Sequence, residues 1–186
     1  MSLHKALVFR QCNLFVLKDL LFTQHSYKMA TADGDVGEEN GKLSDFKIIH
    51  KKGDLFSCPE DESLAHCVSE DLRMGKGIAT LFKKNFEGVP ELKAQGKKVG
   101  DVAILKHGKR FVYYLITKPK YFDKPTYATL EDSLRAMQKH CVEHNVTAVS
   151  MPKIGCGLDK LQWPKVEETL MSVFMDTNIV ISVYSL

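Results

Sequence analysis

The sequence lacks the patterns that define several common functional classes. It contains no GxxxxGK(S/T) loop, which excludes a P-loop NTPase. No two cysteines have the CxxC spacing of a zinc or thiol redox site. The apolar runs within residues 1–28 are broken repeatedly by charged and amide side chains. None of them approaches the roughly 20 apolar residues that a membrane span needs. From these absences we expect no metal, no cofactor and no membrane partner.

Charge and cysteine content restrict the function further. The formal net charge is +3, and residues 1–28, with four basic residues and one acid, account for all of it. The rest of the chain is neutral overall, which gives no global electrostatic reason to expect duplex nucleic acid binding, although it leaves a local basic patch open. The five cysteines are odd in number and widely spread, which favours reduced thiols over a disulfide framework.

Two segments precede the part of the chain that has a globular pattern. Residues 1–28 are apolar and basic, which fits an extension from an alternative start, with Met29 as the usual initiator, or a targeting presequence. The extension is favoured because arginine is scarce. Residues 29–45 are rich in acids and glycine and almost without large apolar side chains, so we expect a disordered tail. The predicted organisation is a disordered or extension segment over residues 1–45 and one domain over residues 46–186.

From Phe46 onward, patterns typical of strands and helices alternate. Leu130, Leu134, Met137 and Cys141 have the spacing of a long amphipathic helix. We expect strands over residues 46–50, 102–106, 111–117, 146–151 and 179–184, with a hairpin turn at 107–109, and helices over residues 77–85, after residue 125 and across residues 166–174. This alternation implies an α/β fold whose sheet is covered on both faces and binds ligands at the carboxyl ends of its strands.

The most informative segment is residues 149–159, where a buried strand runs into the sequence IGCGLD. Gly155 and Gly157 let the backbone turn sharply and present N–H groups without an obstructing Cβ. Such groups bind anions, so a phosphorylated ligand is one interpretation. The other is a tight strand-to-helix turn without a ligand, and the glycines alone favour neither. The glycines within residues 75–77 predict a second loop that touches the same ligand.

Three further residues have both a structural and a chemical interpretation. Asp159 has the spacing of a helix N-cap, with Gln162 at the third helical position, which favours a capping role. Lys118 ends a strongly apolar run, where desolvation would favour the neutral, nucleophilic amine, although a surface lysine is the usual occupant of such a position. Cys156 would be a nucleophile only with a histidine against its sulfur, and His66 is expected to pack within a strand.

Taken together, the motifs resemble those of the macrodomain family. The resemblance covers roughly residues 46–186 without a large insertion. It rests on residues 52–56, 63–71, 73–79, 114–118, 124–127 and 151–163. Many macrodomains have an asparagine pair in the loop that here reads VSED, at residues 68–71. The absence of those amides points away from a water positioned by asparagine and toward the lysine-based branch of the family.

The resemblance implies a macrodomain fold, an α/β architecture with a mixed, mostly parallel sheet sandwiched between helices. It also implies a hydrolase that removes ADP-ribose from glutamate side chains and deacylates O-acetyl-ADP-ribose, with Lys118 as nucleophile and Asp159 as acid and base. The implied substrate-binding positions are Asp54 and Leu55 at the adenine end, Ser69 beside the distal ribose, Lys153, Ile154, Gly155, Cys156, Gly157 and Leu158 around the diphosphate and distal ribose, and Leu186 over the adenosine.

The same resemblance gives the expected partners: ADP-ribose, O-acetyl-ADP-ribose and ADP-ribosylated proteins, bound by a monomer in the nucleus. The main alternative is a module that binds ADP-ribose without catalysis. The two readings differ in one structural requirement. A hydrolase needs the side chains of Lys118 and Asp159 in one pocket, within hydrogen-bond reach or one bridging water, whereas a binding module does not.

Overall fold

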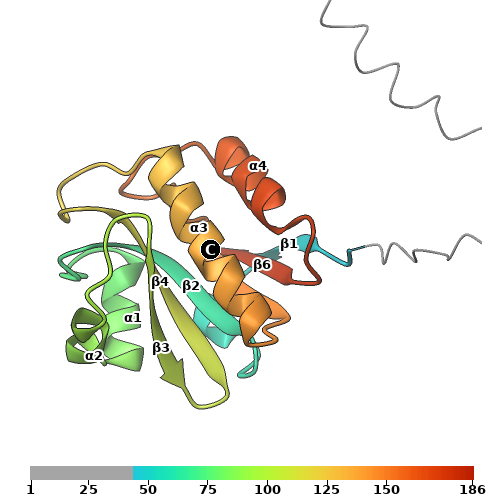
Figure 1. The fold of residues 1–186 in the computed structure, drawn as a ribbon, viewed down its shortest axis with the longest axis horizontal. Coiled ribbons are helices and arrows are strands. Elements are labelled where there is room, and N and C mark those ends of the chain that lie inside the picture. Colours follow the sequence, from blue (N-terminus) through green and yellow to red (C-terminus); the bar gives the residue numbers. More distant parts are fainter. Residues whose placement is uncertain (1–43) are drawn as a thin grey trace, which may run out of the picture. The chain divides into compact units, whose positions relative to one another are not determined.

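The computed structural model describes residues 44–186 (Figure 1). The predictions of an extension over residues 1–28 and of a disordered tail up to residue 43 lie outside the described residues. The first strand begins at Lys47, next to the position where order was expected to begin. Within residues 44–186, no helix is both long enough and apolar enough to cross a membrane.

A six-stranded sheet forms the centre of the domain, and its strand order is β1-β6-β5-β2-β4-β3. Neighbouring strands are parallel except β3 and β4, which form an antiparallel hairpin at one edge. The strands are β1 (Lys47–Lys52), β2 (Ser63–Ser69), β3 (Val102–His107), β4 (Arg110–Lys118), β5 (Ala148–Pro152) and β6 (Val180–Ser185). The predicted mixed, mostly parallel sheet is confirmed.

Helices cover both faces of this sheet. Helices α3 (Tyr127–Glu143) and α4 (Trp163–Phe174) lie together in Figure 1 and pack on one face, where they close the larger of two hydrophobic clusters. The second cluster, on the other face, is closed by α1 (Ile78–Phe86), α2 (Val89–Ala94) and the short 3-10 helix η1 (Leu55–Ser57).

Strand β4 shows how the sequence builds these two layers. Successive side chains of a strand point to opposite faces of its sheet. Tyr113 and Leu115 accordingly belong to the cluster under α3 and α4, whereas Tyr114 and Ile116 belong to the cluster under α1 and α2. An almost continuous apolar run therefore supplies both cores at once, as expected for a strand buried on both faces.

The predicted helix cap at Asp159 is wrong. Helix α4 begins at Trp163, its N-cap is Gln162, and no side chain caps its first turn. Pro164 occupies the first turn of the helix, where the fixed φ of proline favours the helix and its missing N–H costs nothing. The segment from Asp159 to Leu161 is thus a loop, and the Asp159 carboxylate is free to serve another partner.

Candidate active site

Strands β2, β4 and β5 end at the same edge of the sheet, and a cavity of about 600 Å³ opens there. Their last residues, Ser69, Lys118 and Pro152, all line it. The rest of the wall comes from residues 66–68 of β2, residues 73–79 and 121–124, and the loop that follows β5. This is the position at which a parallel sheet binds ligands, because the loops after neighbouring strands converge there.

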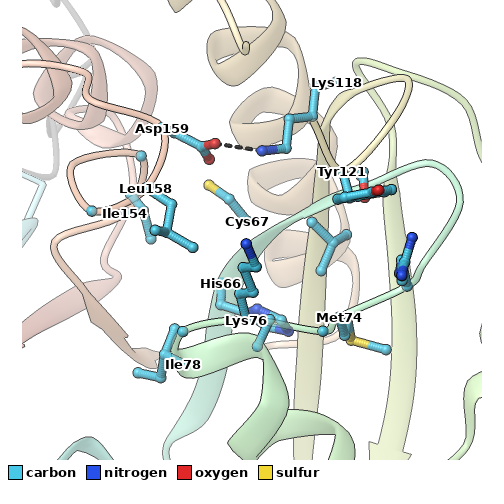
Figure 2. Close-up of a pocket in the computed structure, with 18 of the residues that line it drawn as sticks. His66, Cys67, Met74, Lys76, Ile78, Lys118, Tyr121, Ile154, Leu158 and Asp159 are labelled. Atoms are coloured by element: carbon cyan, nitrogen blue, oxygen red, sulfur yellow. Dashed lines mark hydrogen bonds and ion pairs between the residues drawn. The ribbon is translucent and has the colours of Figure 1, made fainter. Parts of the chain in front are cut away.

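Lys118 and Asp159 meet in this cavity, although 41 positions separate them in the chain. Lys118 Nζ donates to Asp159 Oδ1 at 2.5 Å, and only 11% and 13% of the two side chains remain exposed. Figure 2 shows the pair bridging the cavity, with the thiol of Cys67 directed toward Asp159. Because water is largely excluded, the interaction between the two charges is stronger than that of an exposed ion pair.

The loop after β5 is held in a shape that only glycine allows at one position. Gly155 has a φ of +70°, and a Cβ there would lie 2.7 Å from a methyl carbon of Leu161. Gly157 is different, because nothing lies within 4 Å of a Cβ built on it. Gly157 also lines the cavity, and a residue without a side chain lets a ligand approach the backbone closely.

The start of α1 faces this loop across the cavity. Its N-cap is Gly77, with a φ of +61°, and no side chain caps the first turn. A Cβ on Gly77 would lie 3.5 Å from the side chain of Leu158, so the two loops approach each other closely. The carbonyl oxygen of Leu158 also accepts a hydrogen bond of 3.0 Å from Lys124 Nζ. Backbone N–H groups at an uncapped helix start attract anions, so the two loops together can hold a diphosphate.

Asp71 ties together the loops that follow β2 and β4. Its carboxylate accepts hydrogen bonds from Ser69 Oγ at 2.6 Å, Arg73 N at 3.2 Å and Tyr121 N at 3.3 Å. Partial burial alone would raise the pKa of Asp71, but these donors outweigh it and lower the pKa overall. The three donors come from both loops, so one ionised side chain fixes the rim of the cavity.

Neither cysteine near the site is built as a nucleophile. Burial, followed by the neighbouring Asp159 charge, raises the pKa of Cys67 to about 12. Burial also raises the pKa of Cys156, whose Sγ donates to the Ile154 carbonyl. Within residues 44–186, no hydrogen bond joins either sulfur to a histidine, so the structure gives no support to a cysteine–histidine hydrolase.

His66 is expected to pack within a strand, and this prediction is confirmed, but its contact with the cavity was not foreseen. The residue is fully buried, lines the cavity and stacks on Phe82 with ring centroids 3.8 Å apart. Burial lowers its pKa to about 3, so the ring is neutral. Neither ring nitrogen has a hydrogen-bond partner within the protein. Nothing in its sequence context distinguishes it from an ordinary core residue.

The structure brings most of the predicted site residues together. Those that line the cavity are Ser69, Lys118, Lys153, Ile154, Gly155, Gly157, Leu158 and Asp159. Four predicted residues do not line the cavity. Asp54 caps η1 through a 3.0 Å hydrogen bond from Phe56 N, and Leu55 is buried in the core. The thiol of Cys156 donates to the Ile154 carbonyl within its own loop, and Leu186 is fully exposed. Ligand contacts stay predictions for all of the predicted site residues, including those that line the cavity.

Residues 73–79 and 121–124 complete the wall, and the sequence indicated only the glycines of the first segment as part of the site. The aromatic side chains of Tyr121 and Phe122 follow no periodic pattern, so periodicity gave no signal for them. Among the described residues, no three His, Cys, Asp or Glu side chains are close enough to hold a metal ion.

Comparisons with known proteins agree with this architecture. The family described as Macro domain matches residues 65–170. The human ADP-ribose glycohydrolase OARD1 is 57% identical over 140 residues, which cover 75% of this chain and 92% of the human protein. The bovine protein of the same name is 54% identical over 150 residues, which cover 81% of this chain and 99% of that protein.

A solved structure supports the fold independently. The macrodomain of Thermus aquaticus DarG superposes with a TM-score of 0.68 at 22% sequence identity, and the match covers 76% of this chain and 99% of that one. At such low identity the likeness concerns the fold alone.

Proposed function

We propose that this chain, which belongs to the macro domain family, is an ADP-ribose hydrolase that frees glutamate side chains from ADP-ribose and deacylates O-acetyl-ADP-ribose. The observation that carries the proposal is the Lys118–Asp159 pair, a nucleophile beside a proton acceptor at the end of a ligand-sized cavity. The names of the human and bovine relatives support the reaction class. The identity of the modified side chain and the lysine chemistry are the finer parts of the proposal.

The two opposed loops would hold the diphosphate of ADP-ribose. The uncapped start of α1 at Gly77 and the turn around Gly155 and Gly157 both line the cavity, and free backbone N–H groups of these two segments would bind the phosphates. Lys76 and Lys153 line the same cavity and add positive charge. Lys118 lines the same cavity, so phosphates bound there would hold the distal ribose next to the reacting amine. The reaction then becomes effectively intramolecular.

In the first step, Asp159 would accept a proton from Lys118 directly through their hydrogen bond. The neutral amine then attacks carbon C1″ of the distal ribose, and its new N–C bond replaces the C–O bond to the glutamate carboxylate. The departing carboxylate takes the proton held by Asp159 and leaves as the free acid, which returns Asp159 to its ionised form. In the second step, Asp159 promotes attack of water on the lysyl adduct. This releases ADP-ribose and regenerates the amine.

The alternative, an ADP-ribose reader without catalysis, would not need this pair. A binding module requires the phosphate loops, and the charge of Lys118 alone would serve it. The short contact between the two side chains meets the requirement that separates a hydrolase from a reader and favours the hydrolase. The nuclear location and monomeric state rest on the resemblance alone and stay predictions.

A peptide carrying ADP-ribose on glutamate tests the proposal when it is offered to the wild type and to Lys118→Ala and Asp159→Ala. We expect both variants to lose hydrolysis by about 10² to 10⁴-fold, the range of a positioned acid–base group. Asp159→Ala should also accumulate a covalent adduct, visible by mass spectrometry as a mass increase on Lys118. Loss of the neighbouring negative charge favours the neutral amine, whereas no carboxylate remains to activate water for the second step. Lys139→Ala, which removes an exposed lysine of α3 that does not line the cavity, is the control and should keep full activity. Full activity in either catalytic variant contradicts the mechanism.

A further inference from the structure

Two exposed aromatic side chains stand at the mouth of the cavity, and the chemistry described above does not use them. Tyr121 is 45% exposed and Phe122 is 68% exposed, yet both line the cavity. Their rings pack edge to face, with centroids 5.1 Å apart. Isolated exposed apolar residues are ordinary, but two packed aromatic rings beside a binding cavity form a contact surface of the kind that ligands bury.

This aromatic pair is held in place before any ligand arrives. The Tyr121 backbone N–H donates to Asp71, and the guanidinium of Arg73 lies 4.2 Å from the centre of the Tyr121 ring. The Lys120 backbone N–H donates to Asp123 at 3.0 Å, and Asp123 N donates back to the Lys120 carbonyl, which closes a tight turn around the pair. A surface that is already ordered loses little entropy when a partner binds.

The position of the pair identifies what would reach it. Tyr121 follows Lys118 by three residues, so their Cα atoms lie within about 11 Å of each other, and both residues line the cavity. Figure 2 shows Tyr121 on the Lys118 side of the cavity, opposite Leu158 and Asp159. The diphosphate is assigned to the loops around Gly77 and Gly155. The bond broken at C1″ therefore releases its acceptor on the side where Tyr121 and Phe122 lie.

The surrounding charges favour a peptide over a nucleic acid as the acceptor. The carboxylates of Asp71 and Asp123 lie among the cations Arg73, Lys76, Lys120 and Lys124 of the two loops. The Lys124 ammonium is hydrogen-bonded to the Leu158 carbonyl. A strand of nucleic acid needs a continuous basic track for its phosphates, together with open ring faces for its bases. Here the signs are mixed, and Arg73 covers one face of the tyrosine ring.

We propose that Tyr121 and Phe122 determine acceptor specificity by binding a large apolar side chain next to the ADP-ribosylated glutamate of a protein substrate. The preferred acceptor would carry leucine or an aromatic residue within about two positions of the modified glutamate. This inference rests on the proposed function for the placement of ADP-ribose. It adds a specificity that neither the phosphate loops nor the Lys118–Asp159 pair supplies.

Binding to non-hydrolysable peptide conjugates tests the specificity without relying on turnover. Two peptides carry ADP-ribose through a stable linkage at the glutamate position, one flanked by leucine and the other by serine, and free ADP-ribose is the reference. We expect the wild type to bind the leucine peptide roughly tenfold more tightly than the serine peptide, the value of one well-buried apolar contact. Phe122→Ser should reduce this ratio to about one.

Met171→Ser is the matched control, because Met171 is 54% exposed on α4 and does not line the cavity. It should keep the tenfold ratio. A wild type without a preference, or a preference that survives Phe122→Ser, overturns the proposal. So does a Phe122→Ser variant that loses more affinity for an ADP-ribosylated oligonucleotide than for the leucine peptide. A wild type that shows the preference but cleaves neither hydrolysable counterpart would contradict the proposed hydrolysis while supporting the acceptor site.

Discussion

Tyr113 and Tyr114 are neighbours in β4, but they point into two differently built layers. Under α3, the Tyr113 hydroxyl is 3.0 Å from His140 Nδ1 and accepts a hydrogen bond from Cys141. Under α1, the Tyr114 hydroxyl has no partner within the protein. Burial raises the pKa of both phenols, so both rings stay neutral. The layer under α3 therefore gives its buried tyrosine hydroxyl hydrogen-bond partners, and the layer under α1 gives its own none.

Two further buried polar side chains differ in the same way. Ser133 of α3 donates to the carbonyl oxygens of Ile116 and Thr129, whereas both ring nitrogens of His66, beneath α1, lack partners. A buried polar group without a hydrogen bond costs free energy. Such costs persist where function requires them, and the α1 layer is the one that places His66 against the cavity.

The first turns of the two helices differ in the same direction. Thr126 caps α3 and forms a reciprocal capping box with Thr129, so side chains satisfy free backbone donors there. Gly77 begins α1 without any side-chain cap. Both helices begin beside residues that line the cavity, but only the start of α1 leaves its donors to a ligand. The comparison indicates that the α3 layer stabilises the domain and that the α1 layer binds.

Acid should expose the largest difference between the layers, through His66. Its folded-state pKa of about 3 lies below the ordinary value of 6.5, so between these pH values the unfolded chain takes up a proton that the folded protein refuses. Stability therefore falls as the pH drops from 6.5 toward 3. Between pH 7 and pH 5 we expect a loss of about 2 kcal/mol, measured by urea unfolding.

His66→Leu should remove this component of the acid sensitivity, and His107→Leu, which replaces an exposed histidine, should keep it. If the leucine variant does not fold, an NMR titration of the wild type gives the same information. A His66 ring that protonates near pH 6 would contradict the assignment of the uncompensated buried polar group to the α1 layer.

Closing the uncapped helix start should affect binding more than folding. Gly77→Ala introduces a methyl group at a positive φ and 3.5 Å from Leu158, in the gap between the two loops. We expect ADP-ribose to bind at least tenfold more weakly, measured by isothermal titration calorimetry, because the backbone can no longer approach the phosphates.

Gly96→Ala is the control for backbone strain, since Gly96 also has a φ of +61° but nothing lies within 4 Å of its added Cβ. Both variants should lose about 1–2 kcal/mol of stability from the positive φ. Equal affinities in the two variants would remove the argument that the start of α1 holds the diphosphate.

Removing the capping box of α3 should lower stability without weakening ligand binding, and its effect should be the smallest of the three. Thr126→Ala removes the hydroxyl that accepts from Thr129 N, at a cost of about 1 kcal/mol measured by thermal or urea unfolding. The affinity for ADP-ribose should stay at the wild-type value. Thr169→Ala, which removes an exposed helical hydroxyl, is the control. A marked loss of binding in the Thr126 variant would show that the two helix starts share the ligand.

Several features of the fold were predictable because they are encoded locally. The 3.6-residue spacing from Leu130 to Cys141 predicts α3, and all four apolar residues are buried on one side of it. The residues at 107–109 predict the hairpin between β3 and β4, which is confirmed. The glycines around residue 155 predict a turn after a buried strand. Gly155 indeed has a φ of +70°, a backbone conformation that favours glycine.

The site was less predictable, because its contacts join distant segments. The local pattern at Asp159 favoured a helix cap, and the tertiary structure instead gives its carboxylate to Lys118. Only the resemblance to macrodomains indicated that pairing. The aromatic rings of Tyr121 and Phe122 lie in a loop whose conformation depends on Asp71, 50 positions before Tyr121. No pattern within the loop itself specifies that hydrogen bond.

By itself, then, the sequence determined which residues are buried and where the chain turns, because strand and helix periodicities act over a few neighbouring residues. The tertiary structure decided what those turns are for. The strand order brings the ends of β2, β4 and β5 to one edge, which alone makes neighbours of Ser69, Lys118 and the loop after Pro152. The same packing leaves His66 without a partner beneath α1 and leaves the start of that helix open to a ligand.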